Sequence, residues 1–496
     1  MTTETTAPIT ATAPSPRRWA GLAVLAASLL VVVMDMTVLN VALPDLIADL
    51  KPGAVSQLWI VDAYPVVLAG LLVPVSSLAD RWGRRRMLLS GFTVFGVASS
   101  LVLLADSPAQ VIALRAALGV GGAMIMPTTL SLIRTLFPDP VERATALGIW
   151  AATASLGSAL GPILGGALLE MFSWHSAFLV NVPLMVVAVI AGLVLLPESR
   201  SARPGRLDAL GVALSVGGMV AIVYAIKQLG KDGVEVLTLG ILAAGLAALA
   251  AFAYRCLTQP EPMLAVDLFQ NRVFRSGVIT AVAHSGVTMA LLLVGSQWLQ
   301  LVQGWSPLKA GAALLPMALG GMIGSPFAPA VAARIGVRTV LVTGLLTTAT
   351  GLAVIAVLPH PMPYPGIAFA LLCNGLGGAA LGVGSALMMG SAPAHQAGSA
   401  AAIEEMSFEV GAVLGVSVLG SLAGIVYRGG LPDGVDDAVS ESVAGALGTA
   451  TEKAATASFV DAFAMVGLAG AVAVVLTAAV VWWWVPGDLD LADAHH

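Results

Sequence analysis

Residues 79–91 read ADRWGRRRMLLSG and residues 332–344 read AARIGVRTVLVTG, so the chain repeats a short polar segment between two apolar runs. The copies share arginine and glycine at matching positions: Arg81, Gly83, Arg85 and Gly91 in the first, and Arg334, Gly336, Arg338 and Gly344 in the second. Asp80 of the first copy is replaced by Ala333 in the second. Two related halves are typical of transporter folds in which a binding site lies between the repeats.

The composition is that of an integral membrane protein. Hydrophobic residues make up 58% and charged residues 10% of the 496 positions, and the mean hydropathy is +0.93. One water-soluble core cannot bury that much apolar surface. Apolar runs of about 20 residues, the length that crosses a bilayer, predict the spans. We predict an all-α integral membrane protein with fourteen transmembrane helices, arranged as two pseudo-symmetric six-helix bundles plus two extra helices between them.

The predicted domain division follows from this count. An N-terminal six-helix bundle is expected at residues 1–200, two linker transmembrane helices at 201–258, and a C-terminal six-helix bundle at 259–496. The extra pair follows the charged segment PESRSARPGRLD and precedes QPEPMLAVDLFQNR, as expected of an insertion between two halves. A long outer loop is predicted at 428–458.

The basic residues predict the orientation. The loops on the side of the N-terminus carry most of the 23 Lys and Arg residues, including the run 84–86. The opposite loops are expected to carry Lys51, Lys227, Lys231, Lys309, Arg428 and Lys453. Because cytoplasmic loops are enriched in Lys and Arg, we predict that both termini lie in the cytoplasm.

Five segments carry polar or glycine-rich patterns: 35–44 (DMTVLNVALP), 76–85 (SSLADRWGRR), 115–122 (RAALGVGG), 157–166 (GSALGPILGG) and 398–415 (GSAAAIEEMSFEVGAVLG). Together they resemble the major facilitator superfamily, specifically its fourteen-helix drug:proton antiporters. Two positions depart from the family pattern, since Ser76 replaces a glycine and Leu118 a glutamine. The last segment is similar to helix 13 of the members that export quaternary ammonium compounds and other lipophilic cations.

Three carboxylates lie within the apolar segment 398–415. Glu405 and Glu409 are four residues apart and share one helical face, whereas Glu404 lies about 100° round from Glu405. A carboxylate at the centre of a lipid-embedded helix costs about 2.5–3.5 kcal/mol, so these side chains are expected to line a cavity. We predict that Glu405 and Glu409 bind protons and cationic substrate, with Phe408 and Glu404 as further substrate contacts. A purely structural role is the alternative for Glu404.

Asp35, Asp62 and Arg115 are further charged residues expected within spans. A carboxyl group buried in an apolar cavity can take and give protons near neutral pH, so Asp35 is predicted to couple protons and to contact substrate. We expect it to face one chamber together with the acids of segment 398–415. Asp62 is predicted at the outer mouth, either as a first contact for cations or as a solvated carboxylate, and the nearby Trp59 and Tyr64 are predicted to contact substrate. Arg115 either ties helix 4 to a neighbour or, as the resemblance implies, takes part in proton coupling.

Two more motifs are assigned to movement or to packing. The predicted gating loop consists of Asp80, Arg81, Gly83, Arg84 and Arg85. The predicted antiporter motif of helix 5 consists of Gly157, Gly161, Pro162, Gly165 and Gly166. The loop could simply be a basic segment that fixes the topology, whereas the resemblance favours a latch at Asp80. The glycines of helix 5 could simply allow close helix packing, whereas the resemblance adds a bend at Pro162.

These expectations combine into a proton-coupled antiporter that exports lipophilic, mainly cationic drugs, such as quaternary ammonium compounds, dyes and antibiotics, across a bacterial inner membrane. Its partners would be protons, substrates and membrane lipids, and it would act as a monomer. The sequence has no phosphate-binding loop, metal-ligand spacing or nucleophile–base pair, so we expect no cofactor, metal, nucleic acid or enzymatic activity. Two alternatives stay open: a same-fold exporter of a neutral or zwitterionic natural product or lipid, and a non-transporting membrane receptor or scaffold.

Overall fold

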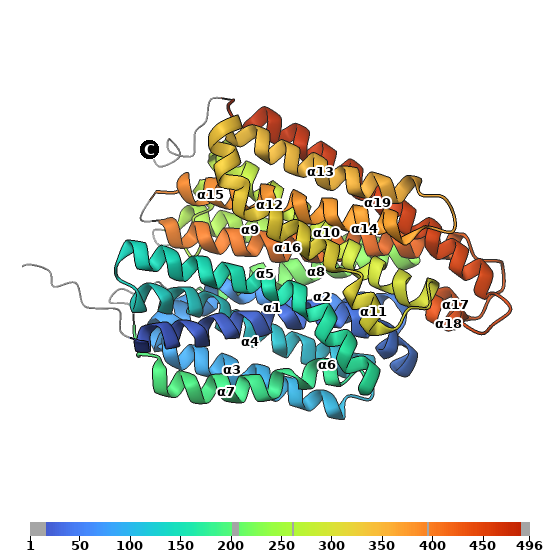
Figure 1. The fold of residues 1–496 in the computed structure, drawn as a ribbon, viewed down its shortest axis with the longest axis horizontal. Helices are drawn as coiled ribbons and strands as arrows, with labels where there is room; N and C mark the ends of the chain where they lie inside the picture. Colours follow the sequence, from blue (N-terminus) through green and yellow to red (C-terminus); the bar gives the residue numbers. More distant parts are fainter. Residues whose placement is uncertain (1–15, 201–207, 260–261, 394–395, 488–496) are drawn as a thin grey trace, which may run out of the picture.

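The computed structural model describes residues 16–200, 208–259, 262–393 and 396–487, and this part of the chain contains helices and no strand (Figure 1). Among the described residues, fourteen helical segments are long and apolar enough to cross a membrane, as predicted. The principal helices are α1 (Pro16–Leu50), α2 (Ala54–Trp82), α3 (Arg84–Leu101), α4 (Pro108–Leu136), α5 (Pro140–Met171), α7 (Asn181–Leu195), α8 (Ala209–Asp232), α9 (Val236–Thr258), α10 (Arg272–Gln297), α12 (Leu315–Ile335), α13 (Val337–Val357), α14 (Tyr364–Gly377), α15 (Ala379–Gly390), α16 (Ala397–Gly429) and α19 (Glu452–Trp484).

Short helices complete or connect the spans. They are α6 (Ser176–Leu179), α11 (Pro307–Ala312), α17 (Asp437–Glu441), α18 (Val443–Ala446), the 3₁₀ turns Val102–Leu104 and Val266–Gln270, and the π-helical turn Trp298–Val302. The start of α11 shows how the local sequence caps a helix. The Ser306 side chain accepts a hydrogen bond from the Lys309 N–H, and Pro307 occupies the first turn, where its missing N–H leaves no donor unsatisfied.

The repeated sequence segment has the same backbone form in both halves. Gly83 separates α2 from α3 with φ of +122°, and Gly336 separates α12 from α13 with φ of +87°. Positive φ is unfavourable for residues with a Cβ atom, so each turn favours glycine. The sequence repeat is therefore a structural repeat.

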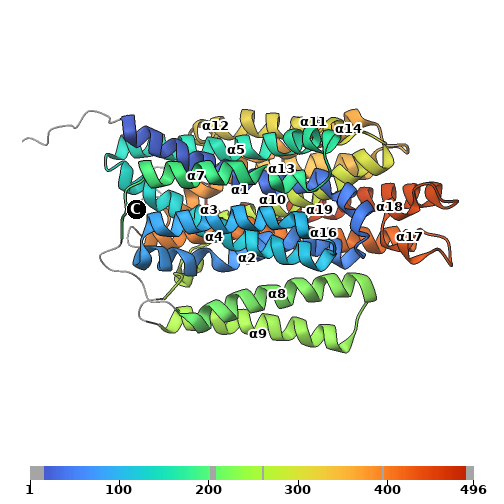
Figure 2. The ribbon, with the colours of Figure 1, turned by 90° about the horizontal axis from the view of Figure 1, so that it is seen from below.

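Helices α1–α7 pack on one another, and α10–α19 form a second group. In the first group α1 lies against α5 and α2 against α4, whereas in the second α10 lies against α16 and α13 against α19. Helices α8 and α9 form a hairpin along one edge of the molecule (Figure 2). Helix α8 contacts α2 of the first group and α16 of the second, so the extra pair reaches both groups.

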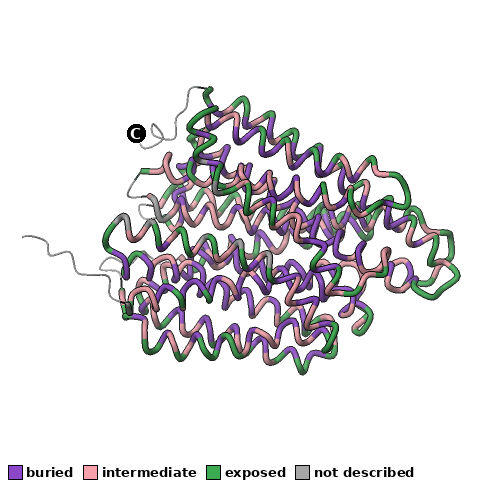
Figure 3. Tube along the Cα trace, viewed as in Figure 1, coloured by how far each residue is buried: buried purple, intermediate pink, exposed green. Residues whose placement is uncertain are grey.

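Exposed positions lie along the outer helices (Figure 3), and many of them are large apolar residues. On α7, for example, Val187 and Ile190 are 63% and 59% exposed. Burial of apolar surface drives the folding of soluble proteins, whereas lipid tails are as apolar as these side chains and cover them without penalty. The exposed apolar faces therefore fit contact with lipid.

The described chain begins and ends at the same end of the helix bundle, where α1 starts and α19 stops (Figure 1). We call this the terminal end and the opposite one the far end. The predicted loop 428–458 lies at the far end but is shorter than predicted, because α16 runs to Gly429 and α19 begins at Glu452. It folds into α17 and α18, and the Tyr427 hydroxyl donates to the Val439 carbonyl at 2.8 Å.

Hydrogen bonds join the two groups of helices towards the far end. The Ser296 hydroxyl of α10 donates to the Asn40 carbonyl of α1 at 2.7 Å, and Ser306 donates to a carboxylate oxygen of Glu170 at 2.6 Å. At Gly311 an added Cβ atom would lie 2.0 Å from the Pro162 carbonyl oxygen, so α11 and α5 touch through their backbones. The two groups are thus held together at the far end.

Candidate functional site

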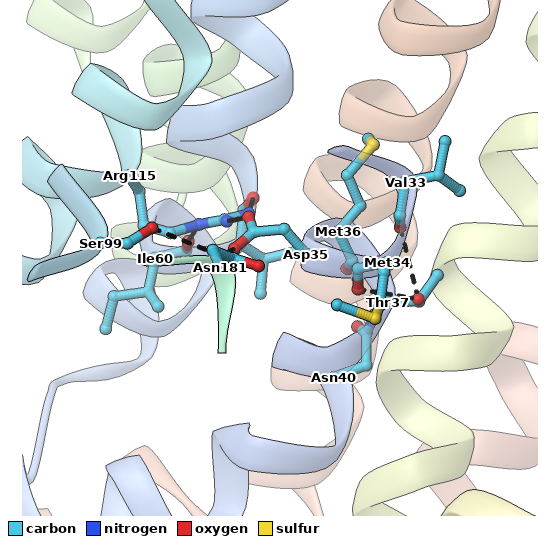
Figure 4. Close-up of polar contacts among 11 residues, drawn as sticks. Val33, Met34, Asp35, Met36, Thr37, Asn40, Ile60, Ser99, Arg115 and Asn181 are labelled. Carbon is cyan, nitrogen blue, oxygen red and sulfur yellow. Dashed lines mark hydrogen bonds and ion pairs between the residues drawn. The ribbon is translucent and has the colours of Figure 1, made fainter. Parts of the chain in front are cut away.

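A buried ion pair joins α1 to α4 (Figure 4). Nη1 of Arg115 lies 2.7 Å from Oδ2 of Asp35, and the Asn181 side chain of α7 donates to Oδ1 of Asp35 at 2.7 Å. Nε of Arg115 donates to the Ile60 carbonyl at 3.1 Å, and its guanidinium carbon lies 4.7 Å from the centre of the Tyr64 ring. Asp35 and Arg115 therefore neutralise each other where water cannot reach.

The arginine therefore ties α4 to α1, as one of its two interpretations holds, and its role in proton coupling stays a prediction. Asp35 does not line the same cavity as Glu405, which differs from the expectation of one shared chamber. Asn181 was not anticipated. Its only sequence signal is a lone amide within the apolar run FLVNVPL, since polar groups in lipid need a partner.

A second buried ion pair connects α2 to the extra hairpin. Nζ of Lys227 on α8 lies 2.8 Å from Oδ2 of Asp62, and both side chains are fully buried. The Ser417 hydroxyl of α16 donates to the same carboxylate oxygen at 2.8 Å. The Lys227 ammonium also lies 4.1 Å from the centre of the Trp59 ring.

One alternative for Asp62 and the placement of Lys227 are wrong here. Asp62 is buried and is not a solvated carboxylate, and Lys227 is not in an outer loop, because α8 extends past it to Asp232. A contact of Asp62 with cationic substrate stays a prediction. A single lysine near the end of an apolar run looks like the start of a loop. Only the partner Asp62, distant in sequence, allows it to stay buried.

The acids of α16 are placed differently from Asp35 and Asp62. Glu405 lines a cavity of about 100 Å³ between α2, α4, α5 and α16. The cavity is lined by Leu72, Ser76, Met126, Pro127, Leu130, Ser131, Arg134, Trp150, Ala401, Ala402 and Glu405. Arg134 belongs to the last turn of α4, so the cavity lies towards the terminal end.

Glu409, one turn deeper than Glu405, is buried, and its Oε2 has no hydrogen-bond partner among the described residues. Glu404 does not line this cavity, and its carboxyl group lies near Ser385 of α15. In the described ranges no basic side chain forms an ion pair with any of these three acids. Glu405 and Glu409 are thus carboxylates without a fixed counter-ion.

The aromatic residues predicted to contact substrate already have partners. Tyr64 lies against Arg115 and Trp59 against Lys227, so both stack on internal cations. Phe408 packs in an apolar cluster around α10 and α15, and its carbonyl accepts a hydrogen bond from Ser285 at 2.7 Å. None of the three lines the Glu405 cavity.

The predicted gating loop is tied to the segment after α7. Asp80 pairs with Nη2 of Arg84 at 2.8 Å. The Arg85 N–H donates to Glu198 at 3.1 Å, and the Arg84 N–H donates to the Ser199 carbonyl at 2.9 Å. The loop is therefore held by Glu198 and Ser199, which the sequence did not reveal because they lie far along the chain.

The helix 5 motif brings three chain segments close together. An added Cβ atom would lie 2.9 Å from the Leu30 carbonyl at Gly157, and 3.0 Å from the Met34 carbonyl at Gly161. At Gly166 it would lie 2.5 Å from the Leu308 Cα atom, next to α11. The motif therefore packs α5 against α1 and also against the other group of helices.

Comparisons with known proteins identify the class of protein. A model of the Major Facilitator Superfamily matches residues 25–416, and the chain belongs to this superfamily of membrane transporters. It is 40% identical over 450 residues to the multidrug efflux pump LfrA of Mycolicibacterium smegmatis, covering 89% of each chain. It is 34% identical over 444 residues to the methyl viologen resistance protein SmvA of Salmonella typhimurium, covering 88% of this chain and 89% of the relative.

A third relative is the puromycin resistance protein pur8 of Streptomyces alboniger, which is 36% identical over 418 residues and matches 83% of this chain and 82% of its own. Among solved structures, a bacterial homologue of the human lysosomal transporter Spinster superposes with a TM-score of 0.65 at 18% identity, over 95% of this chain and 98% of that one. The relatives are efflux and resistance proteins, which points to a transporter and not to an enzyme.

Proposed function

We propose that the protein is a proton-coupled antiporter that exports lipophilic, mainly cationic drugs. The observation that carries the proposal is the contrast between its buried acids. Asp35 and Asp62 each pair with a buried cation at 2.7–2.8 Å, whereas Glu405, which lines a cavity, and Glu409, one turn deeper, form no ion pair within the described ranges. An unpaired carboxylate within a membrane is costly, so Glu405 and Glu409 favour binding either a proton or a substrate cation.

Competition between these two ligands produces antiport. A cation and a proton each neutralise the same carboxylates, so binding of one releases the other. Burying the α16 acids in the closed bundle costs less free energy when they are neutral than when they are charged. The states that carry a proton or a cation therefore rearrange more readily than the empty state. The Asp35–Arg115 pair is the proposed second proton-coupling element, because protonation of Asp35 would free the Arg115 guanidinium from its partner.

The orientation is also part of the proposal. Arginines 84–86 and Arg134 lie at the terminal end, where the Glu405 cavity also lies. The positive-inside rule places this end in the cytoplasm of a bacterium, with both termini inside. The cavity would then receive drugs from the cytoplasm, and the monomer would release them outside.

The relatives support this substrate class and leave room for an alternative. One is named for resistance to methyl viologen, a dication, and another for resistance to puromycin. Export of neutral or zwitterionic compounds is the second candidate, favoured by a cavity that His284 and Asn374 line and that has no acidic or basic lining residue among those described. A receptor or scaffold is disfavoured because the similar chains are efflux pumps.

Transport by reconstituted protein tests the proposal. Proteoliposomes with an imposed pH gradient would be compared for wild type, Glu405→Gln, Glu409→Gln and Glu235→Gln, the last being a control at an exposed glutamate before α9. We expect gradient-driven movement of tetraphenylphosphonium with wild type and the control, and at least a 10-fold loss with either α16 variant. Equal activity of all four proteins, or transport independent of the gradient, would contradict the proposal.

A further inference from the structure

A second cavity, of about 240 Å³, lies between α5, α10, α12, α14 and α15, away from the Glu405 cavity. It is lined by Ser158, Pro162, His284, Thr288, Gly311, Leu314, Met317, Ala318, Gly321, Met322, Ser325, Asn374, Gly375, Gly378, Leu381 and Gly382. We infer that this cavity is a substrate subsite for uncharged groups that carry a hydrogen-bond-accepting oxygen, such as a carbonyl. The inference rests on the proposed export function and names a second class of substrate group for it.

Asn374 provides the first donor. Its side chain is 1% exposed, and its Oδ1 accepts a hydrogen bond from the Thr288 hydroxyl at 3.0 Å. Its Nδ2 has no partner among the described residues, although a buried amide donor without a partner is unfavourable. Because the residue lines the cavity, a ligand there can accept the missing hydrogen bond.

His284 provides the second donor. Its Nδ1 lies 3.2 Å from the Thr348 hydroxyl, inside the helix group. We assign the tautomer in which the Thr348 hydroxyl donates to Nδ1, so that the imidazole proton lies on Nε2. Nε2 is directed at Gly378, since a Cβ atom added there would lie 3.8 Å away, and Gly378 lines the cavity. Glycine therefore leaves the Nε2 donor accessible.

The other residues that line the cavity indicate that its ligand is uncharged. None of the described lining residues is Asp, Glu, Lys or Arg, so no group there can neutralise a charged ligand. Two inward donors with no carboxylate select an acceptor oxygen over an ammonium group. An apolar cavity of about 150 Å³ holds benzene, so this one has room for one substituted ring.

The position of the cavity ties it to transport. Ser158 and Pro162 come from α5 of the first helix group, whereas His284 and Asn374 come from the second. A ligand would thus contact both groups and sense any change in their relative position. The subsite would hold the polar, uncharged part of a drug, separately from the charge bound at α16.

Binding to the purified full-length protein in detergent, without a pH gradient, tests the subsite. The probes are chloramphenicol, a neutral amide with one aromatic ring, and tetraphenylphosphonium, a cation without an acceptor oxygen. We expect Asn374→Leu to weaken chloramphenicol binding by about 3- to 10-fold, the worth of one net hydrogen bond, and to change tetraphenylphosphonium binding by less than about 2-fold. The control Thr350→Val, at an exposed threonine of α13, should change neither.

Each other outcome overturns the inference. Equal weakening of both probes would mean that Asn374 only supports the fold, and unchanged chloramphenicol binding would mean that its Nδ2 binds no ligand. A measurement on wild type covers the case in which the variant does not fold. Saturating chloramphenicol should leave the tetraphenylphosphonium affinity within about 2-fold if the subsites are separate, and mutual exclusion would contradict this. If wild type binds both probes but shows no gradient-driven transport, the result counts against the proposed function and not against the subsite.

Discussion

The buried pair of Asp62 and Lys227 predicts that removing one charge is worse than removing both. The 2.8 Å contact is fully buried, and apart from Lys227 only Ser417 donates to Asp62 among the described residues. Lys227→Met keeps the length of the side chain but leaves the carboxylate without a counter-ion. Breaking such a pair costs about 3–5 kcal/mol, whereas replacing both partners by uncharged residues is often neutral or stabilising.

We therefore expect Lys227→Met and Asp62→Asn each to lower the free energy of unfolding by about 3–5 kcal/mol, and the double variant to stay within about 1 kcal/mol of wild type. Thermal unfolding of the purified proteins in one detergent would measure the order of stabilities. Lys231→Met is the matched control, because this exposed lysine pairs only loosely, at 3.6 Å, with Glu441. A double variant that loses the sum of the two single losses would refute the reasoning.

Three further predictions follow from close contacts. Gly161→Ala should lower the free energy of unfolding by about 1–3 kcal/mol, because its Cβ atom would lie 3.0 Å from a carbonyl oxygen. The control Gly148→Ala has open space around the added Cβ atom and should not destabilise the protein. Thermal unfolding of the two variants measures the difference. Hydrogen bonds from Arg255 hold the pKa of Asp208 below its ordinary value, so its contribution to stability is present above about pH 4 and is lost as the pH falls through the lowered pKa. The stability difference between wild type and Asp208→Asn should accordingly shrink in unfolding measurements at pH 3. Arg115→Gln should abolish gradient-driven transport, and Arg115→Gln with Asp35→Asn should restore stability but not transport, as melting and proteoliposome assays would show.

The fold was predictable because its main features can be read from short stretches of sequence. These are the apolar runs that match the bilayer thickness, the sequence repeat and the glycines at the turns. Gly83 and Gly336 mark corresponding turns, and the apolar runs alone give fourteen spans. The folded loop after α16 was not predictable in the same way. Its order depends on Tyr427 and on buried Val439 and Val443, which are contacts between short segments with no periodicity.

The charged residues of the spans could be found in the sequence, but their pairs could not. Arg115 was expected to need a partner, yet nothing in the spacing of Arg115, Asp35 and Asp62 indicates which helices meet. Lys227 shows the reason, since a lysine at the end of an apolar run is compatible with a loop until Asp62 is brought within 2.8 Å. Asn374 and His284, like Asn181, gave only the weak signal of a single polar residue within a span, because such residues usually satisfy their hydrogen bonds locally.

The most direct test of the account is whether a bound cation expels a proton from the acids of α16. Purified protein in weakly buffered solution would receive tetraphenylphosphonium while a pH indicator follows the release, at pH values from 6 to 9. We predict proton release that saturates together with cation binding and disappears in the variant Glu405→Gln/Glu409→Gln. Cation binding without proton release at every pH, or release that persists in this variant, would contradict exchange at these two carboxylates.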